Sequence, residues 1–475
     1  MPDQCPVLDW AASGGMALTG LADRRPLASA AGAFGLLQQV TDELAVVTRA
    51  VGREVRADPA ELIAGRAALA GFTRQGQVSA GGSTRLLRTA DGWCAVTMSR
   101  IADVECVPAV LGVLGFDALA LHRPPVGRDA VRAAAWSALT TAAASRPAAE
   151  VADAAQLLGI PAAALPSTPE SAPWSPWRAT RIAASAPGPA SLAGAVVVDL
   201  SAMWAGPLCA RLLGLAGAQV IKIESPDRPD GARSGNQRFY DWLHAGHKSV
   251  SFPFRTDPAG AALSSLLSSA DVVIESSRPR ALAGLGVAPG MIPHKPGQVW
   301  LSITGHGRDE PDRVAFGDDA AVAGGLADWT GGGTTDGWGQ GEPVFCADAI
   351  ADPLTGACGA LAVARSLAAG GGELIDLPMR TVAASFAAAA VSWPAHGEHE
   401  LRADDHEPRP DDRGFRPDGT VFSDGTVWCA ALGRTQRVLP PRAPATAPRA
   451  ASLGADTEAV LARLVPHLGP GQPPG

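Results

Sequence analysis

The stretch Ala195-Val196-Val197-Val198-Asp199-Leu200 opens a regular alternation of apolar runs and helical segments, and this alternation decides the fold. An apolar run without polar alternation is typical of a strand that is buried on both faces. A helix is expected next over residues 207–215, followed by a second apolar run at 219–224. A strand, a helix and another strand form a βαβ unit, so the sequence predicts an α/β fold with a doubly wound parallel sheet.

The alternation continues to about residue 304, and smaller α+β parts are expected on both sides of it. Within it, strands are expected at 249–252, 271–275 and 298–304, and a helix at 258–268. Beyond Gly305 we expect helices at 320–329, 380–392 and 457–464, a loop at 330–337 and a strand at 373–377. Before it we expect helices at 31–51 and 59–70, strands at 84–88 and 93–98, and two helices between 130 and 158.

These elements predict five regions. They are an α+β block (1–160), a linker (161–190), the main α/β domain (191–395), a loose polar segment (396–417) and a C-terminal α+β segment (418–475). The linker is dense in Pro, Ser and Ala without periodicity, which is typical of an extended connector. A weak internal repeat relates residues 89–96 to residues 423–430, so the first block is interpreted as a partial copy of the later half.

Composition excludes several classes of protein. Of the 475 residues, 47% are hydrophobic and 18% are charged, as in a globular protein. The net charge is −8 and no basic run occurs, so nucleic acid is not an expected partner. No long apolar run is free of glycine and charge, and no signal peptide is visible, so we expect no membrane span and a cytoplasmic location. The seven cysteines are scattered and form no C-x-x-C, so neither a disulfide framework nor a metal site is expected.

The segment Ala351-Asp352-Pro353 begins a small-residue helix and places a carboxylate at its start. Proline is favoured at the first helical position, so Asp352 is expected to be the N-cap. A carboxylate there accepts hydrogen bonds from free backbone N–H groups and would stay ionised. This local pattern leaves two roles open for Asp352, a helix cap and a nucleophile, and the two roles are compatible.

The order of motifs after residue 190 resembles the family III CoA-transferases, which include formyl-CoA transferase, carnitine CoA-transferase and the 2-methylacyl-CoA racemases. The resemblance covers about residues 195–390 well and 418–465 loosely. Seven motifs carry it: Asp199-Leu200-Ser201 with Trp204-Ala205-Gly206-Pro207, residues 217–224, residues 244–250, residues 271–275 with Arg278-Pro279, residues 302–307, Ala351-Asp352, and residues 453–461. The first block is similar to a truncated, degenerate second copy of the same family's later half.

The resemblance implies an acyl-CoA:carboxylate CoA-transferase with Asp352 as the nucleophile. The carboxylate would attack the donor thioester to give a mixed anhydride, then form an enzyme-bound CoA thioester that the acceptor carboxylate resolves. The expected partners are an acyl-CoA and a carboxylic acid, with the coenzyme A thioester as substrate and no permanently bound cofactor. Family members form interlaced dimers, which leaves a homodimer open for this chain.

The same resemblance places His247, Lys248 and Arg278 near CoA, with imidazole standing at His247 where the family has a basic side chain. The racemase branch pairs the aspartate with a histidine from a Gly-His-Asp motif, because proton exchange needs two bases. This chain has Gly317-Asp318-Asp319 there, which argues against a racemase but leaves Asp318 and His306 as auxiliary acid or base candidates. A catalytically idle CoA-fold binding or scaffold protein is the third reading, and the N-terminal block is expected to be structural.

Overall fold

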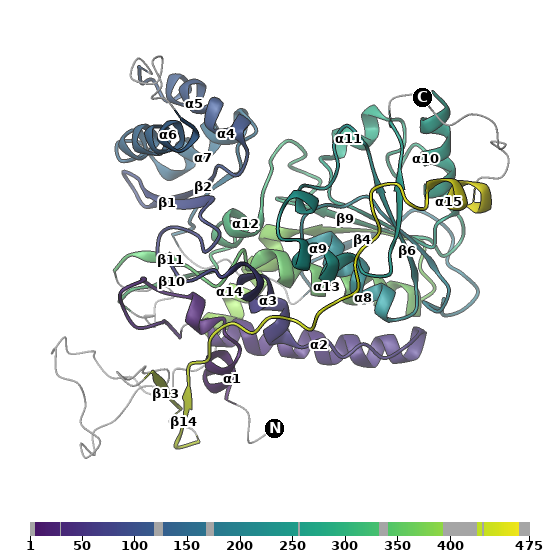
Figure 1. Cartoon of the computed structure of the whole chain (residues 1–475), viewed down its shortest axis with the longest axis horizontal. Coiled ribbons are helices and arrows are strands. Elements are labelled where there is room, and N and C mark those ends of the chain that lie inside the picture. Colours follow the sequence, from purple (N-terminus) through teal and green to yellow (C-terminus); the bar gives the residue numbers. More distant parts are fainter. Residues whose placement is uncertain are drawn as a thin grey trace.

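A computed structural model describes residues 5–28, 30–117, 127–167, 175–254, 257–331, 341–392, 425–429 and 432–464. It contains a seven-stranded sheet with helices on both faces and a smaller α+β unit beside it (Figure 1). The α/β fold with a parallel, doubly wound sheet is therefore confirmed.

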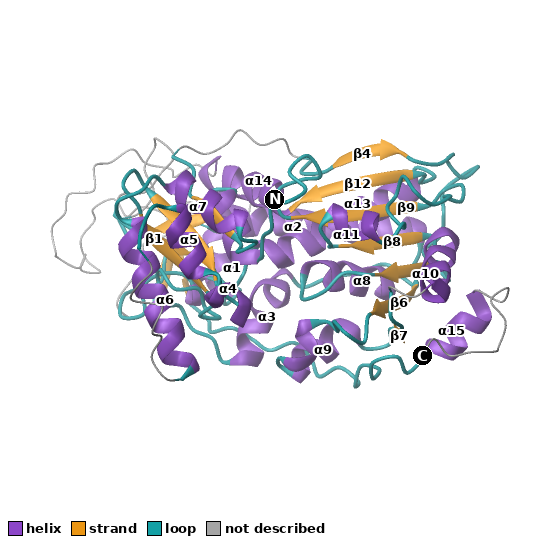
Figure 2. Ribbon diagram, turned by 90° about the horizontal axis from the view of Figure 1, so that it is seen from above, coloured by secondary structure: helices purple, strands orange, loops and turns teal. Residues whose placement is uncertain are grey.

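The large sheet has the strand order β4-β12-β9-β8-β5-β6-β7, which can be followed from one edge to the other in Figure 2. Its strands are β4 (Arg178–Arg181), β5 (Val196–Asp199), β6 (Gln219–Glu224), β7 (Lys248–Ser251), β8 (Val272–Glu275), β9 (Val299–Thr304) and β12 (Glu373–Pro378). All neighbouring pairs are parallel except β4 with β12. The chain leaves β5 toward β6 and β7, and later fills the other side through β8, β9 and β12. The β5–β8 boundary is therefore a topological switch point, where ligands of open α/β sheets bind at the carboxyl ends of the strands.

Each face of the sheet carries its own hydrophobic core. On one face, strand residues such as Val197 and Leu301 pack with α8 (Ala205–Leu215), α13 (Ala351–Ala368) and α2 (Ala31–Val51). On the other face, residues such as Val198 and Trp300 pack with α10 (Asp257–Ser269), α11 (Pro279–Gly284) and α15 (Thr457–Leu464). Successive strand residues point to opposite faces, which explains why these strands are apolar throughout.

The N-terminal block wraps against the main domain. It comprises α1 (Pro6–Ala12), η1 (Met16–Leu18), α2, α3 (Pro59–Ala70), α4 (Ile101–Glu105), α5 (Val107–Val113), α6 (Arg128–Ala143), α7 (Ala148–Leu157) and an antiparallel sheet of β1 (Thr84–Arg88), β2 (Trp93–Thr97) and β3 (Ala162–Ala164). In Figure 1, α2 runs horizontally below the main domain, and α12 (Gly317–Ala323) lies between the small sheet and the large one. The helices expected at 31–51 and 59–70 are confirmed residue for residue.

Two expectations for single segments are wrong. Residues 161–189, expected to be an extended linker, contain β3 and β4, each of which is paired within a sheet. The helix expected over 320–329 ends at Ala323, because the chain turns at Gly324 and Gly325, and Gly325 has a φ of +80°. β10 (Ala327–Trp329) follows and pairs with β11 (Pro343–Phe345). Most of the expected 330–337 loop and the whole segment 396–417 lie outside the described residues.

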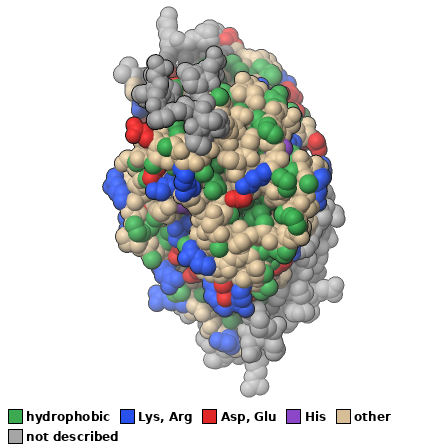
Figure 3. All heavy atoms as spheres, turned by 90° about the vertical axis from the view of Figure 1, so that its right-hand side faces the viewer, with side chains coloured by type: hydrophobic (Ala, Val, Ile, Leu, Met, Phe, Trp, Pro, Cys, Tyr) green, Lys and Arg blue, Asp and Glu red, His purple; other side chains and the backbone are tan. Residues whose placement is uncertain are grey.

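The C-terminal region crosses the molecule from the N-terminal block to the far edge of the large sheet. β13 (Thr426–Cys429) and β14 (Arg434–Arg437) form a hairpin on α1, and the chain then runs extended to α15 (Figure 1). A disulfide joins Cys5 to Cys429, so the expectation that the cysteines stay unpaired is wrong for these two. The face bearing α15 carries basic and acidic side chains intermixed (Figure 3). Within the described residues, no helix is both long and apolar enough to cross a bilayer.

Candidate functional site

Asp352 lies where two helix N-termini meet at the carboxyl edge of the sheet. α13 begins at Ala351 with Ile350 as its N-cap, so Asp352 is the second helical residue and the expectation that it is the N-cap is wrong. Its carboxylate instead faces the backbone N–H of Ala205, the first residue of α8, which favours the charged form. Gly356 allows this approach, because a Cβ there would come within 2.8 Å of the Ala205 carbonyl oxygen. The positive ends of both helix dipoles therefore act on one carboxylate.

Asp352 is half-buried as a residue, whereas its acidic neighbours are buried. Desolvation raises the pKa of Asp352 to about 7, helped by the negative charges of Asp318 and Asp348. The Arg66 guanidinium and the Ala205 N–H act in the opposite direction. The expectation that this carboxylate stays fully ionised is therefore wrong, since a group with this pKa exchanges its proton near neutral pH.

Asp348 is fully buried in the turn before α13 and is neutralised by Arg66 from α3. Arg66 Nε lies 2.9 Å from Oδ2 of Asp348, and Nη2 lies 2.6 Å from Oδ1. The turn itself is unusual, because Ala347 and Ala349 both have positive φ, at 53° and 43°. Non-glycine residues in this region are rare and cluster at functional sites.

Asp318 and Asp319 occupy the first turn of α12 and take their hydroxyl partners from the N-terminal block. Asp318 accepts hydrogen bonds from Thr84 Oγ1 at 3.0 Å and from the Ala349 N–H at 3.1 Å. Asp319 accepts from Thr97 Oγ1 at 2.8 Å and from the Phe316 N–H at 3.1 Å. Burial raises the pKa of Asp318 to about 6 and that of Asp319 to about 8. Asp319 thus caps the helix, while Asp318 belongs to the group around Asp352.

Arg278 lies at the same edge of the sheet, directly after β8 at the start of α11. Beside it lies Gly159 of the N-terminal block, whose carbonyl oxygen accepts a hydrogen bond from Arg100 Nη2 at 3.1 Å. Burial lowers the pKa of Arg278, and so do the positive charges of Arg280, Arg100 and Arg228. No carboxylate among the described residues lies within ion-pair distance of Arg278. This crowding of guanidinium groups at the switch point suits a polyanionic ligand.

His247 and Lys248 lie elsewhere, at the amino end of β7, where Lys248 is the first residue of the strand. The His247 ring lies beside Gly214, at the C-terminal end of α8. Asp352 lies beside Ala205, at the N-terminal end of the same helix. An eleven-residue helix is about 16 Å long, so His247 is far from Asp352. Burial lowers the pKa of His247 to about 3, so its ring is neutral. Lys248 Nζ lies 2.7 Å from Oδ1 of Asp456.

His306 follows β9 and is not grouped with the acids. Burial lowers its pKa to about 4, and the positive charges of Arg313 and Arg380 lower it further. The charged groups that act most on Asp352 do not include His306. Of the predicted auxiliary residues, the structure therefore brings Asp318 to Asp352 and leaves His306 apart.

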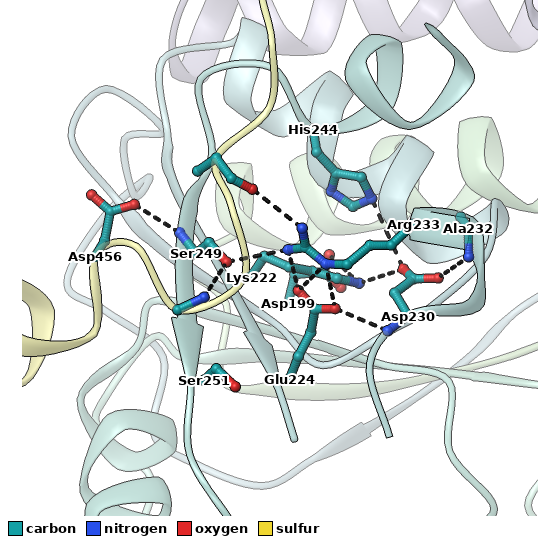
Figure 4. A network of polar contacts seen from close by, with 12 residues as sticks. Asp199, Lys222, Glu224, Asp230, Ala232, Arg233, His244, Ser249, Ser251 and Asp456 are labelled. Atoms are coloured by element: carbon teal, nitrogen blue, oxygen red, sulfur yellow. Dashed lines mark hydrogen bonds and ion pairs between the residues drawn. The ribbon is translucent and has the colours of Figure 1, made fainter. Parts of the chain in front are cut away.

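A buried polar network supports the entry to α8 (Figure 4). Lys222 lies 3.0 Å from Asp230 and 3.5 Å from Asp199, while Arg233 pairs with Glu224. Asp230 accepts a hydrogen bond from the N–H of Met203 at 3.0 Å, and Met203 has a φ of 72°. The network thereby fixes the strained backbone that precedes Trp204 and Ala205, and so fixes the amide that reaches Asp352.

Sequence reasoning missed Arg66, Asp348, Thr84 and Thr97. Three of these four belong to the N-terminal block, and their role depends on how that block docks, which no local spacing reveals. Asp348 stands four residues before Asp352, but nothing in the sequence marks the left-handed turn around it. Among the described residues, no group of three or more His, Cys, Asp and Glu side chains is arranged to hold a metal ion.

The structure is thus an open, mostly parallel α/β fold with a carboxylate at the carboxyl edge of its sheet. Residues 192–437 match the family model of CoA-transferase family III. The chain therefore belongs to that family. The predicted resemblance is therefore confirmed.

Curated relatives match only part of the chain. The succinyl-CoA–D-citramalate CoA-transferase of Chloroflexus aurantiacus is 32% identical over 28% of this chain and 36% of its own length. The succinate–glutarate CoA-transferase of Agrobacterium fabrum is 29% identical over 40% of this chain and 51% of its own length. The chain thus spans about a third to a half of these relatives. A crystal structure of a hypothetical protein from Mycobacterium tuberculosis is 28% identical, with 42% of this chain and 57% of that chain covered and a TM-score of 0.37.

Proposed function

We propose that the chain is an acyl-CoA:carboxylate CoA-transferase in which Asp352 is the nucleophile. The observation that carries the proposal is the position of the Asp352 carboxylate, which faces the Ala205 N–H between the N-termini of α8 and α13. Membership of the family supports the same chemistry, and the named relatives are CoA-transferases.

The proposed reaction proceeds through four balanced transfers. A carboxylate oxygen of Asp352 attacks the thioester carbonyl, which gives a mixed anhydride and releases the CoA thiolate. The thiolate attacks the aspartyl carbonyl, which forms an aspartyl-CoA thioester and frees the donor acid as a carboxylate. The acceptor carboxylate attacks this thioester to give a new anhydride and the thiolate again. The thiolate then attacks the acceptor's carbonyl, which releases the new acyl-CoA and restores the Asp352 carboxylate.

The environment of Asp352 suits these steps. Negative charge moves repeatedly between thiolate and carboxylate, and the helix N-termini stabilise it without net proton transfer. The nucleophile must be ionised at the start, so the rate should rise with pH through the Asp352 pKa of about 7. Burial also keeps the carboxylate poorly hydrated and therefore reactive toward a carbonyl.

Of the three residues proposed to contact CoA, Arg278 has the strongest support. It lies at the switch point in the positive field of Arg100 and Arg228, and no carboxylate among the described residues pairs with it, so a phosphate of CoA could bind its guanidinium. Lys248 is a weaker candidate because Asp456 already neutralises it, and the neutral ring of His247 offers no charge.

The racemase alternative requires a second base that can face the substrate. Asp318 lies near Asp352, but Thr84 and the Ala349 N–H occupy its two carboxylate oxygens. This arrangement favours a supporting role for Asp318 rather than proton abstraction.

The proposal is tested by trapping the acylated enzyme. The full chain is incubated with succinyl-CoA, acetyl-CoA or formyl-CoA and then with hydroxylamine, and the Asp352 peptide is analysed by mass spectrometry. A hydroxamate on Asp352 in wild type, absent from Asp352→Asn, is the expected result. Solvent deuterium entering the α-carbon of 2-methylacyl-CoA without trapping would overturn transfer in favour of racemisation. Neither signal, together with no binding of CoA, would leave a catalytically idle scaffold protein.

A further inference from the structure

Arg66 reaches the candidate site from a helix that lies outside the matched segment 192–437. It stands on α3, and α3 is docked on α9 (Gln237–His244) near both of its ends. Glu61 Oε1 accepts a hydrogen bond from Trp242 Nε1 at 2.9 Å, and the Leu69 carbonyl oxygen accepts one from Asn236 Nδ2 at 2.9 Å. Arg66 lies between these two anchors, so its backbone is held against the main domain.

The first contact of Arg66 is with the turn that leads into α13. Two parallel hydrogen bonds join its guanidinium to Asp348, whose side chain has no solvent exposure. Without Arg66, the buried Asp348 carboxylate would have no cation to offset the free-energy cost of its burial. The conformation of the turn therefore depends on the arginine. The turn carries left-handed residues on both sides of Asp348, and Asp352 is the second residue of the helix that follows it.

The second contact is with the residue that opens α8. The Cζ atom of Arg66 lies 4.7 Å from the centre of the Trp204 ring, and the Phe72 and Phe239 rings lie around it at 5.7 and 6.0 Å. Trp204 is the N-cap of α8, and the next residue is Ala205, whose N–H reaches Asp352. One guanidinium therefore touches the residues in front of both helices that meet at Asp352.

We propose that Arg66 is a positioning residue for Asp352, joining the turn before α13 to the N-cap of α8 so that the carboxylate and its amide donor keep a fixed geometry. This inference rests on the proposed role of Asp352 as nucleophile. It gives the N-terminal block a functional part, in place of the purely structural part expected from the sequence.

The geometry requires arginine rather than any cation. Only a planar guanidinium offers two parallel N–H groups to a carboxylate while its face stacks on an aromatic ring. Lysine at this position would keep the charge but would lose the two parallel hydrogen bonds to Asp348 and the stacking on Trp204.

Arg66 also lowers the pKa of Asp352 through its positive charge. The charged groups that act on this carboxylate are Arg66 on α3, Asp318 on α12 and Asp348 before α13, while α8 contributes the uncharged Ala205 N–H. Arg66 is the positive member of the set. Its removal leaves burial and two negative charges, all of which favour the protonated carboxyl.

The test compares wild type, Arg66→Gln and Arg66→Lys, with Arg56→Gln as the control because Arg56 is 79% exposed and pairs only with Glu54 among the described residues. The titration of Asp352 is followed in the full chain without substrate, from the ¹³Cγ signal that disappears in Asp352→Asn. The rate of Asp352 acylation by the acyl-CoA that labels wild type is measured alongside it.

We expect wild type and Arg56→Gln to titrate near pH 7, and Arg66→Gln at least about one pH unit higher. Arg66→Lys should titrate near wild type yet acylate about tenfold more slowly, because charge is kept and geometry is lost. An unchanged midpoint in folded Arg66→Gln overturns the inference. If Arg66→Gln does not fold, unchanged acylation in Arg66→Lys overturns it. If wild type is not acylated, the proposed function is refuted instead. The titration of Asp352 needs no substrate, so it still tests whether Arg66 acts on Asp352.

Discussion

The α-carbon of Gly317 lies so close to the Asp352 carboxylate that a methyl group on it would overlap Oδ2. The same methyl group would overlap the carbonyl oxygen of Ala349, which belongs to the left-handed turn before α13. A side chain at residue 317 would therefore push apart α12 and the start of α13. This contact makes Gly317 a sensitive probe of how accurately Asp352 must be placed.

Gly317→Ala should reduce acylation of Asp352 by about 100-fold, because displacements of about 1 Å cost that much in rate. It should also lower the free energy of unfolding by about 1–3 kcal/mol through overpacking. The control is Gly112→Ala, an exposed position within α5 where an added Cβ meets nothing within 4 Å. That variant should be as stable as wild type or slightly more so. Equal acylation rates in the two variants would contradict the tight placement of Asp352.

Asp352→Asn should be more stable than wild type at pH 8 but not below pH 4. The folded-state pKa of Asp352 is raised from 3.8 to about 7, so the folded state binds the proton more tightly than the unfolded state. Wild-type stability therefore falls as pH rises from about 4 to about 7, and the asparagine does not share this loss. We expect a gain of roughly 1–3 kcal/mol in urea unfolding at pH 8. A less stable Asp352→Asn protein at pH 8 would show that the carboxylate is a structural cap instead.

The strands and long helices of this chain could be predicted because their signals are local. The apolar run of β6 and the helical period of α2 and α3 each lie within one element, and the residue bounds were predicted accurately. The order of motifs was sufficient to recognise the family, because many weak signals in sequence order support one another. Hence six of the seven strands of the large sheet and several of its helices could be predicted from the residues, and the resemblance pointed to Asp352.

The surroundings of Asp352 could not be predicted, because they depend on contacts between distant parts of the chain. Arg66 and Asp348 are 282 residues apart, and neither belongs to a motif that marks the pairing. The proline after Asp352 suggested an N-cap, but the left-handed residues Ala347 and Ala349 start the helix earlier. The raised pKa of Asp352 likewise comes from burial and from acids on other elements.

Asp319→Asn should preserve the fold at neutral pH, whereas Asp319→Leu should not. Burial raises the pKa of Asp319 to about 8, so the side chain is mostly a neutral acid at pH 7, and an amide can replace it. The Asn oxygen can still accept from Thr97 and from the Phe316 N–H. Leucine removes the acceptor of both donors and should cost about 2–4 kcal/mol. The Tm of both variants at pH 7 checks this, and a large loss in Asp319→Asn would mean that the carboxylate is ionised.

Arg278→Gln should weaken CoA binding more than Lys248→Gln does. Arg278 has no carboxylate partner among the described residues and lies beside other guanidinium groups, so it is available to a phosphate. Lys248 is already paired with Asp456 and lies at the amino end of β7. We expect the Kd for CoA, measured by calorimetry, to rise about tenfold for Arg278→Gln, the loss of one charge-assisted contact. A larger effect of Lys248→Gln would move the phosphate site to the β7 edge.

Reduction of the Cys5–Cys429 disulfide should loosen the β13–β14 hairpin without disturbing the large sheet. The disulfide joins the residue before α1 to the last residue of β13, and these elements share few contacts with the α8–α13 core. Hydrogen exchange should therefore speed up in α1, β13 and β14 on adding dithiothreitol, and Cys5→Ser should reproduce the effect.

The matched control is Cys106→Ser, because Cys106 is a free, partly exposed cysteine in the same block. It should exchange like wild type under both conditions. The disulfide closes a loop of more than 400 residues, so its loss should lower the free energy of unfolding by about 2–4 kcal/mol. Because the hairpin is remote from Asp352, acylation of Asp352 by succinyl-CoA should survive reduction. A parallel loss of acylation would show that the C-terminal crossing, which continues from this hairpin to α15, is coupled to the site.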